Sequence, residues 1–169
     1  ENGEEVKPGS NMTGKLALGY PLPVGYYKDP EKTEATFPTI NGRRWSIPGD
    51  WASVEKDGSI TLLGRGSECI NTGGEKVFPE EVEEALKINP LVVDCNVVGI
   101  SDERWGQAVT AVVEIKTGAT LEEAELLTEV KERLAGYKVP KSVIFVEKLK
   151  RGPNGKADYR WARDIAESP

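Results

Sequence analysis

The sequence contains no histidine, two cysteines and one methionine among its 169 residues. Without histidine, the chain cannot by itself build a Ser-His-Asp triad or use an imidazole as a general base. A zinc site is not expected, because zinc in proteins is held mainly by cysteine and histidine. Cys69 and Cys95 both lie in apolar, extended runs. We therefore expect two buried free thiols in a reducing, cytoplasmic compartment, and a disulfide between them stays open.

Long apolar runs and an excess of positive charge are also missing. No apolar stretch reaches the roughly 18 residues that a transmembrane helix requires, so we expect no membrane span. The formal net charge is −6, which argues against a protein that binds the phosphate backbone of nucleic acids. A local group of basic side chains would still suffice for one anionic ligand.

The central segment, residues 64–86, combines a glycine pair with the start of a helix. Gly73-Gly74 is typical of a hairpin turn between two strands, and such a pair also lets another molecule approach the main chain closely. Pro79 fits the first position of a helix, because its missing N–H would have no helical partner there. The helix is predicted over 79–88, and four acidic residues lie near its positive end: Glu80, Glu81, Glu83 and Glu84.

Residues 1–66 are expected to be rich in strands and poor in helix. Asn41-Gly42 and Asp57-Gly58 favour hairpin turns, and a short capped helical turn is predicted at 29–34. Extended segments are predicted at 15–20, 43–47, 51–55 and 59–63.

Residues 67–169 predict an α+β arrangement, in which a small sheet carries packed helices. Thr120 with Glu123 predicts a capping box, and Gly136 is expected to end the helix that this box begins. The order after residue 69 is predicted as strand, helix, strand, strand, helix, strand and helix, with strands at 69–72, 92–100, 107–115 and 142–147 and a closing helix at 158–166.

Lys156 is the candidate catalytic cation. It follows Pro153-Asn154-Gly155, a turn sequence that is expected to present the lysine on an exposed loop, where its charge could meet a phosphate. A solvated surface lysine is the simpler alternative. The four tryptophans are interpreted as packing residues: Trp45, Trp51, Trp105 and Trp161.

Other polar residues allow two interpretations each. Asp50 is either a turn aspartate that caps nearby N–H groups or a carboxylate that accepts two ribose hydroxyls. Arg65, between two glycines, is either a surface ion-pair partner or a second contact to a ribose or a phosphate. Tyr137 and Lys141 belong either to the solvated end of a helix or to a site where the ring stacks on adenine beside a phosphate-binding lysine.

These motifs occur together, and in this order, in one family. The pattern from Gly64-Arg65 through Gly73-Gly74 to Pro79, together with Pro153-Asn-Gly-Lys156, resembles the C-terminal portion of an adenylate-forming (AMP-binding) acyl-CoA synthetase. The strings Gly-Tyr-Tyr-Lys-Asp-Pro at 25–30 and Ile-Asn-Thr-Gly-Gly-Glu-Lys-Val-Phe-Pro-Glu-Glu-Val-Glu at 70–83 are similar to those of actinobacterial fatty-acid and steroid-side-chain CoA ligases.

The resemblance implies two parts. Residues 1–66 would be the distal, β-rich segment of a large N-terminal AMP-binding domain, and residues 67–169 a mobile C-terminal lobe that pivots at Ser67. Two positions depart from the family pattern, because Pro48 stands where the family usually has threonine and Ser67 where its hinge is usually aspartate or lysine.

The resemblance also implies a role for each candidate residue. Asp50 and Arg65 would hold the AMP ribose, and Lys156 would serve adenylation. The remaining candidates would lie on the CoA side, along the pantetheine tunnel or near the CoA nucleotide: Gly73, Gly74, Glu75, Lys76, Tyr137 and Lys141.

The implied reaction activates a carboxylic acid, a fatty acid or a steroid side chain, as acyl-AMP with ATP and then transfers the acyl group to CoA. The ATP phosphate loop, the Mg²⁺ ligand and the acyl pocket are expected outside this chain, which opens on Glu1 and is interpreted as a fragment that is inactive alone. An adenylation domain that serves a carrier protein and a stand-alone binding module stay open as alternatives, although no carrier segment follows Pro169. A homodimer is also compatible with the sequence.

Overall fold

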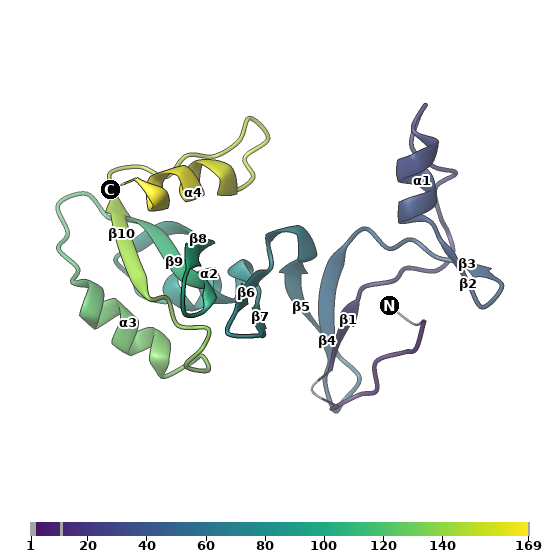
Figure 1. Cartoon of the computed structure of the whole chain (residues 1–169), viewed down its shortest axis with the longest axis horizontal. Coiled ribbons are helices and arrows are strands. Elements are labelled where there is room, and N and C mark those ends of the chain that lie inside the picture. Colours follow the sequence, from purple (N-terminus) through teal and green to yellow (C-terminus); the bar gives the residue numbers. More distant parts are fainter. Residues whose placement is uncertain (1–2, 11, 169) are drawn as a thin grey trace. The chain divides into compact units, whose positions relative to one another are not determined.

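The chain divides into two compact units, Glu1–Ser67 and Glu68–Pro169. The computed structural model describes residues 3–10 and 12–168. Both units combine strands with helix, and most of the helical residues lie in the second (Figure 1). The α+β class expected from the sequence is confirmed.

The first unit is built on a three-stranded antiparallel sheet in the order β1–β4–β5. These strands are β1 (Thr13–Lys15), β4 (Asp50–Val54) and β5 (Ile60–Arg65). The strand expected at 15–20 overlaps β1 only at Lys15. Beyond Lys15, the N–H of Leu16 donates to the carbonyl of Asp50 at 2.7 Å, and an isolated bridge joins Leu18 to Ser46. Pro21 and Pro23 follow, and neither has an N–H for a strand ladder.

Two local predictions for the first unit are confirmed. β2 (Thr39–Ile40) and β3 (Arg43–Arg44) form a hairpin around Asn41-Gly42. α1 (Pro30–Thr36) begins after Asp29, whose carboxylate accepts the N–H of Lys32 at 3.0 Å. β3 is shorter than the strand expected at 43–47, since its partner β2 has only two residues.

The second unit is organised around the long antiparallel pair of β8 (Val92–Asp102) and β9 (Gly106–Ile115). β10 (Ser142–Val146) adds to β9 in parallel. The hairpin of β6 (Ile70–Thr72) and β7 (Glu75–Val77) joins the same sheet where Thr72 pairs with Gly106. The sequence indicated every one of these strands except β7.

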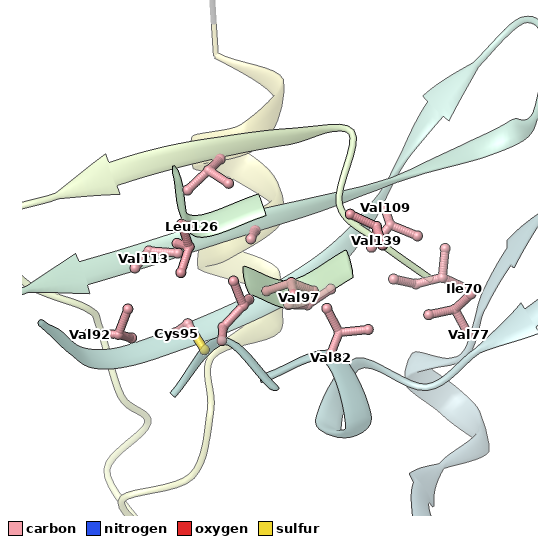
Figure 2. Packing of buried hydrophobic residues seen from close by; sticks show 14 of the residues in the cluster. Ile70, Val77, Val82, Val92, Cys95, Val97, Val109, Val113, Leu126 and Val139 are labelled. Carbon is pink, nitrogen blue, oxygen red and sulfur yellow. The ribbon is translucent and has the colours of Figure 1, made fainter. Parts of the chain in front are cut away.

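Helices cover both faces of this sheet (Figure 1). α2 (Pro79–Leu86) and α3 (Glu123–Lys131) pack into one apolar cluster, which includes Val97. α4 (Tyr159–Glu167) packs into a second cluster, which includes Val98. Neighbouring residues of β8 thus face opposite helices, as the two-residue period of a strand requires. Figure 2 shows labelled members of the first cluster: Ile70, Val77, Val82, Val92, Cys95, Val97, Val109, Val113, Leu126 and Val139.

The expected ends of α3 are wrong. Its N-cap is Glu122 and its last residue is Lys131. The capping box does not form, because the Glu123 carboxylate accepts the N–H of Val143 at 2.8 Å and so supports the start of β10. Gly136 therefore lies beyond the helix and not at its C-terminal cap.

The two cysteines are free, as expected, but only Cys95 is buried. Cys69 is half-buried, since it stands just before β6 and not inside a central strand. Burial raises the pKa of both thiols, so neither is activated as a thiolate.

A buried carboxylate lies at the edge of β8. Glu83 on α2 is 7% exposed, and one of its oxygens accepts the N–H of Val97 at 2.9 Å. The other oxygen accepts the hydroxyl of Tyr159 at 3.3 Å. Burial raises the pKa of Glu83 to about 7, because the charged carboxylate loses hydration there.

We expect Glu83→Gln to remove part of the pH dependence of stability. The pKa of Glu83 is raised from 4.5 to about 7 in the folded protein, so the folded state binds the proton more readily than the unfolded state. The free energy of unfolding should therefore fall by about 3 kcal/mol as pH rises through this window. Urea unfolding at several pH values checks this. Glu84→Gln, on an exposed neighbour, should retain the fall, and an equal fall in Glu83→Gln would contradict the assignment.

Candidate functional site

Lys156 is exposed on a tight loop, residues 151–157, here called the lysine loop. A bridge between Arg151 and Ala157 closes it, and the N–H of Gly152 donates to the carbonyl of Lys156 at 2.8 Å. Gly155 has a φ of 75°, a conformation that glycine adopts without strain. The backbone is thus fixed by its own hydrogen bonds, while the ammonium group is presented to solvent.

Gly73 and Gly74 form the two-residue turn between β6 and β7, in which Thr72 pairs with Glu75. Their φ angles are 59° and 87°, as a tight turn matched to strand twist requires. A Cβ placed at Gly74 would meet nothing within 4 Å. The hairpin interpretation is therefore correct. The main chain is open at Gly74, whereas a Cβ at Gly73 would lie 3.0 Å from the ring of Trp105. Glu75 and Lys76, which follow, are exposed.

The fold brings Trp105 against the glycine turn. Its carbonyl accepts the N–H of Gly73 at 2.8 Å, and its side chain is 36% exposed. The Nζ of Lys141 lies 5.3 Å from its ring centroid, and the guanidinium of Arg104 lies 4.7 Å away. An indole beside two cations and an open main chain suits a nucleotide. Sequence reasoning assigns Trp105 only to packing, because its partners Gly73 and Lys141 lie 32 and 36 positions away.

Tyr137 lies between α3 and β10 and is 40% exposed. The Nζ of Lys138 lies 5.8 Å from its ring centroid and 2.6 Å from a carboxylate oxygen of Glu81. The ring is accessible and has a cation held beside it. A role for Tyr137 in ligand binding stays a prediction.

Asp50 and Arg65 face one another in the first unit. They are register partners at the start of β4 and the end of β5, and the Nε of Arg65 lies 3.3 Å from an oxygen of Asp50. Arg65 therefore has an ion-pair partner, which was one of its two alternatives. The pair also places a carboxylate and a guanidinium together, which is a set of groups that can bind a diol. Ser67 is exposed in the short 3₁₀ turn η1 (Gly66–Glu68) that follows.

Within residues 3–10 and 12–168, no group of three or more His, Cys, Asp or Glu side chains is arranged to hold a metal ion. Of the helices in the described part of the chain, none combines the length and the apolar character that crossing a bilayer demands.

The fold, the lysine loop and the glycine turn define the second unit as the C-terminal domain of an AMP-binding enzyme. Residues 81–156 match the family of AMP-binding enzyme C-terminal domains, so this part of the chain belongs to that family. The family expected from the sequence motifs is confirmed.

The relatives that this chain resembles include CoA ligases. The chain is 56% identical over 168 residues to the medium/long-chain-fatty-acid–CoA/3-oxocholest-4-en-26-oate–CoA ligase of Mycobacterium tuberculosis (strain ATCC 25618 / H37Rv), a match that covers 99% of this chain and 31% of that protein. It is 54% identical over 164 residues to the 3-oxocholest-4-en-26-oate–CoA ligase of Rhodococcus rhodochrous, covering 97% and 30%. The chain thus spans about a third of the length of these relatives.

A solved structure with a bound reaction intermediate has a similar fold. The o-succinylbenzoate CoA synthetase (MenE) of Bacillus subtilis, in complex with the acyl-adenylate OSB-AMP, aligns with a TM-score of 0.81 at 29% identity. The alignment covers 96% of this chain and 31% of that one.

We expect Gly74→Ala to lower the free energy of unfolding by about 1 kcal/mol, because an L-residue at its φ of 87° is strained even though space is open. Gly136→Ala is the matched control. Gly136 also has open space but no positive φ, so its change should stay within about 0.5 kcal/mol. Urea unfolding of both variants measures the difference, and equal effects would show that backbone strain does not select glycine at the turn.

Proposed function

We propose that this chain is the C-terminal part of an AMP-forming acyl-CoA ligase, and that its second unit serves two successive half-reactions. The observation that carries the proposal is the presence, on one small unit, of two different exposed loops. One presents the cation of Lys156, and the other presents the bare main chain of Gly74, while the ring of Trp105 lies against Gly73.

In the first half-reaction a carboxylate attacks the α-phosphate of ATP, which gives acyl-AMP and pyrophosphate. Negative charge is spread over the phosphoryl oxygens in the transition state, and a positioned ammonium group stabilises it. Lys156 is the cation assigned to this step. Asp50 and Arg65 are assigned to the ribose, because the carboxylate accepts hydrogen bonds from hydroxyl groups and the guanidinium donates hydrogen bonds to them.

In the second half-reaction the thiol of CoA attacks the acyl carbonyl and AMP leaves. The thiol is at the end of a long, thin arm, so its path needs a wall without side chains, and the open main chain of Gly74 is assigned to that wall. Glu75 and Lys76 border that path. Trp105, Lys141 and Tyr137 are assigned to the CoA nucleotide, as rings and cations for a base and its phosphates.

Because the two steps use different loops, the second unit is assigned a pivoting motion that presents each loop in turn. Ser67 is assigned to it as the last residue of the first unit. A small polar residue in a short turn suits a hinge.

The activities of the relatives favour a fatty acid or a steroid side chain as the acid, in the cytoplasm.

The described residues offer no cluster suited to Mg²⁺, and its ligand is expected outside this chain.

The test uses a chimera in which this chain replaces the segment that it matches in the Mycobacterium tuberculosis ligase. Lys156→Ala should lower pyrophosphate release by about 100-fold or more, yet leave thioester formation from supplied acyl-AMP within about 3-fold. Gly74→Leu should do the reverse, because its side chain would fill the path of the thiol. Both half-reactions are followed separately by rapid quench.

Lys148→Ala is the control for charge, because Lys148 is also exposed but lies outside the lysine loop. Both of its rates should match those of the unaltered chimera. Equal loss of both half-reactions in Lys156→Ala and in Gly74→Leu would refute the assignment of one loop to each step.

A further inference from the structure

The lysine loop is held at both ends by side chains that the proposed reaction does not use. At its start, the Nε of Arg151 lies 2.8 Å from Oδ2 of Asp94 on β8, and a second N–H of Arg151 donates to the same oxygen. Just after its end, Tyr159 in the first turn of α4 donates its hydroxyl to Glu83 at 3.3 Å. The loop is thus tied to β8 on one side and to α2 on the other.

The two contacts that hold the loop differ in their exposure to water. The side chains of Arg151 and Asp94 are 39% and 22% exposed, so water screens much of their attraction. Glu83 is buried, and its second oxygen is already occupied by the N–H of Val97. The carboxylate is therefore fixed in place, and its hydrogen bond to Tyr159 lies in an interior where such bonds are stronger.

In the sequence, Glu83 also lies between the glycine turn and the lysine loop. α2 begins two residues after β7, which follows the glycine turn. Tyr159 is three residues after Lys156, and Asp158 between them caps α4 by accepting the N–H of Trp161 at 3.0 Å. The contact of Glu83 with Tyr159 therefore joins the helix that follows one loop to the helix that follows the other.

We propose that Glu83 is a positioning residue for adenylation: through the Tyr159 hydroxyl it fixes the start of α4 and with it the place where Lys156 is presented. This inference rests on the proposed role of Lys156, and it assigns to a residue of α2, outside both functional loops, an indirect part in placing that lysine.

Charged and titratable groups surround Glu83 on each packed element. Glu80 lies on α2, Lys87 at its C-terminal cap, Cys95 on β8, Arg151 at the start of the lysine loop and Tyr159 on α4. The hydrogen bond from Tyr159 lowers the pKa of Glu83, against the larger rise from burial. Removing the hydroxyl should therefore raise the pKa of Glu83 further, which carboxyl-carbon NMR of the chain can follow.

The functional test uses the same chimera and the variant Tyr159→Phe, which removes one oxygen and keeps the ring. We expect kcat for adenylation to fall about 10-fold, as misplacement of a catalytic group predicts, with KM for ATP within about 2-fold. Thioester formation from supplied acyl-AMP should not change. Glu83→Ala should also slow adenylation, and the double variant should be no slower than Glu83→Ala alone, because each single change already removes the contact between Glu83 and Tyr159. Glu84→Gln should match the unaltered chimera.

Other results would overturn the inference. Equal losses in both half-reactions would mean that the contact only supports the fold, and additive losses would mean that the two residues act separately.

A second measurement decides the point independently of activity. On the chain itself, Tyr159→Phe should speed amide hydrogen exchange of Gly152 and Gly155, whose N–H groups bond within the loop, by about 10-fold. The amide of Gly73, bonded to Trp105, should exchange as before. Unchanged exchange in the loop would refute the inference. If Lys156→Ala left adenylation intact, the proposed function would fail, and the exchange rates would still show whether Glu83 holds the loop.

Discussion

The alternation of side chains along the β8–β9 pair is the constraint on which the second unit depends. Because Val97 and Val98 point to opposite faces, one hairpin must be covered by helices on both sides. That demand places α2 and α3 on one face and α4 on the other. The two loops with proposed functions therefore come just before these helices in the chain. The glycine turn precedes β7 and α2, and the lysine loop precedes α4.

Features that depend on a few neighbouring residues could be predicted from the sequence. The hairpin at Asn41-Gly42, the cap of α1 at Asp29 and the exposed lysine loop follow from the conformations that these residues allow. The order of motifs was enough to indicate the family. The capping box at Thr120 failed for a physical reason, since the Glu123 carboxylate finds a better partner in the N–H of Val143, 20 residues away.

Features that depend on distant contacts could not be predicted. Trp105 reaches the glycine turn only because β6 joins the end of β9 at Gly106. Glu83 reads in the sequence as one of four solvated glutamates near a helix start, yet it is buried against Val97 and Tyr159. Periodicity assigns a residue to a face of its own element, but it does not say which other element will cover that face.

The burial of Glu83 requires an explanation, because a carboxylate with a pKa near 7 destabilises the fold that holds it at neutral pH. An apolar side chain at this position would avoid that cost, but it would leave the N–H of Val97 without an acceptor and Tyr159 without a fixed partner. Packing alone would allow α4 to slide along the sheet, since apolar contacts carry little direction. A hydrogen bond with a defined geometry removes that freedom. Glu83 thus lowers the stability of the domain at neutral pH, and its hydrogen bond to Tyr159 is suited to fix the position of Lys156.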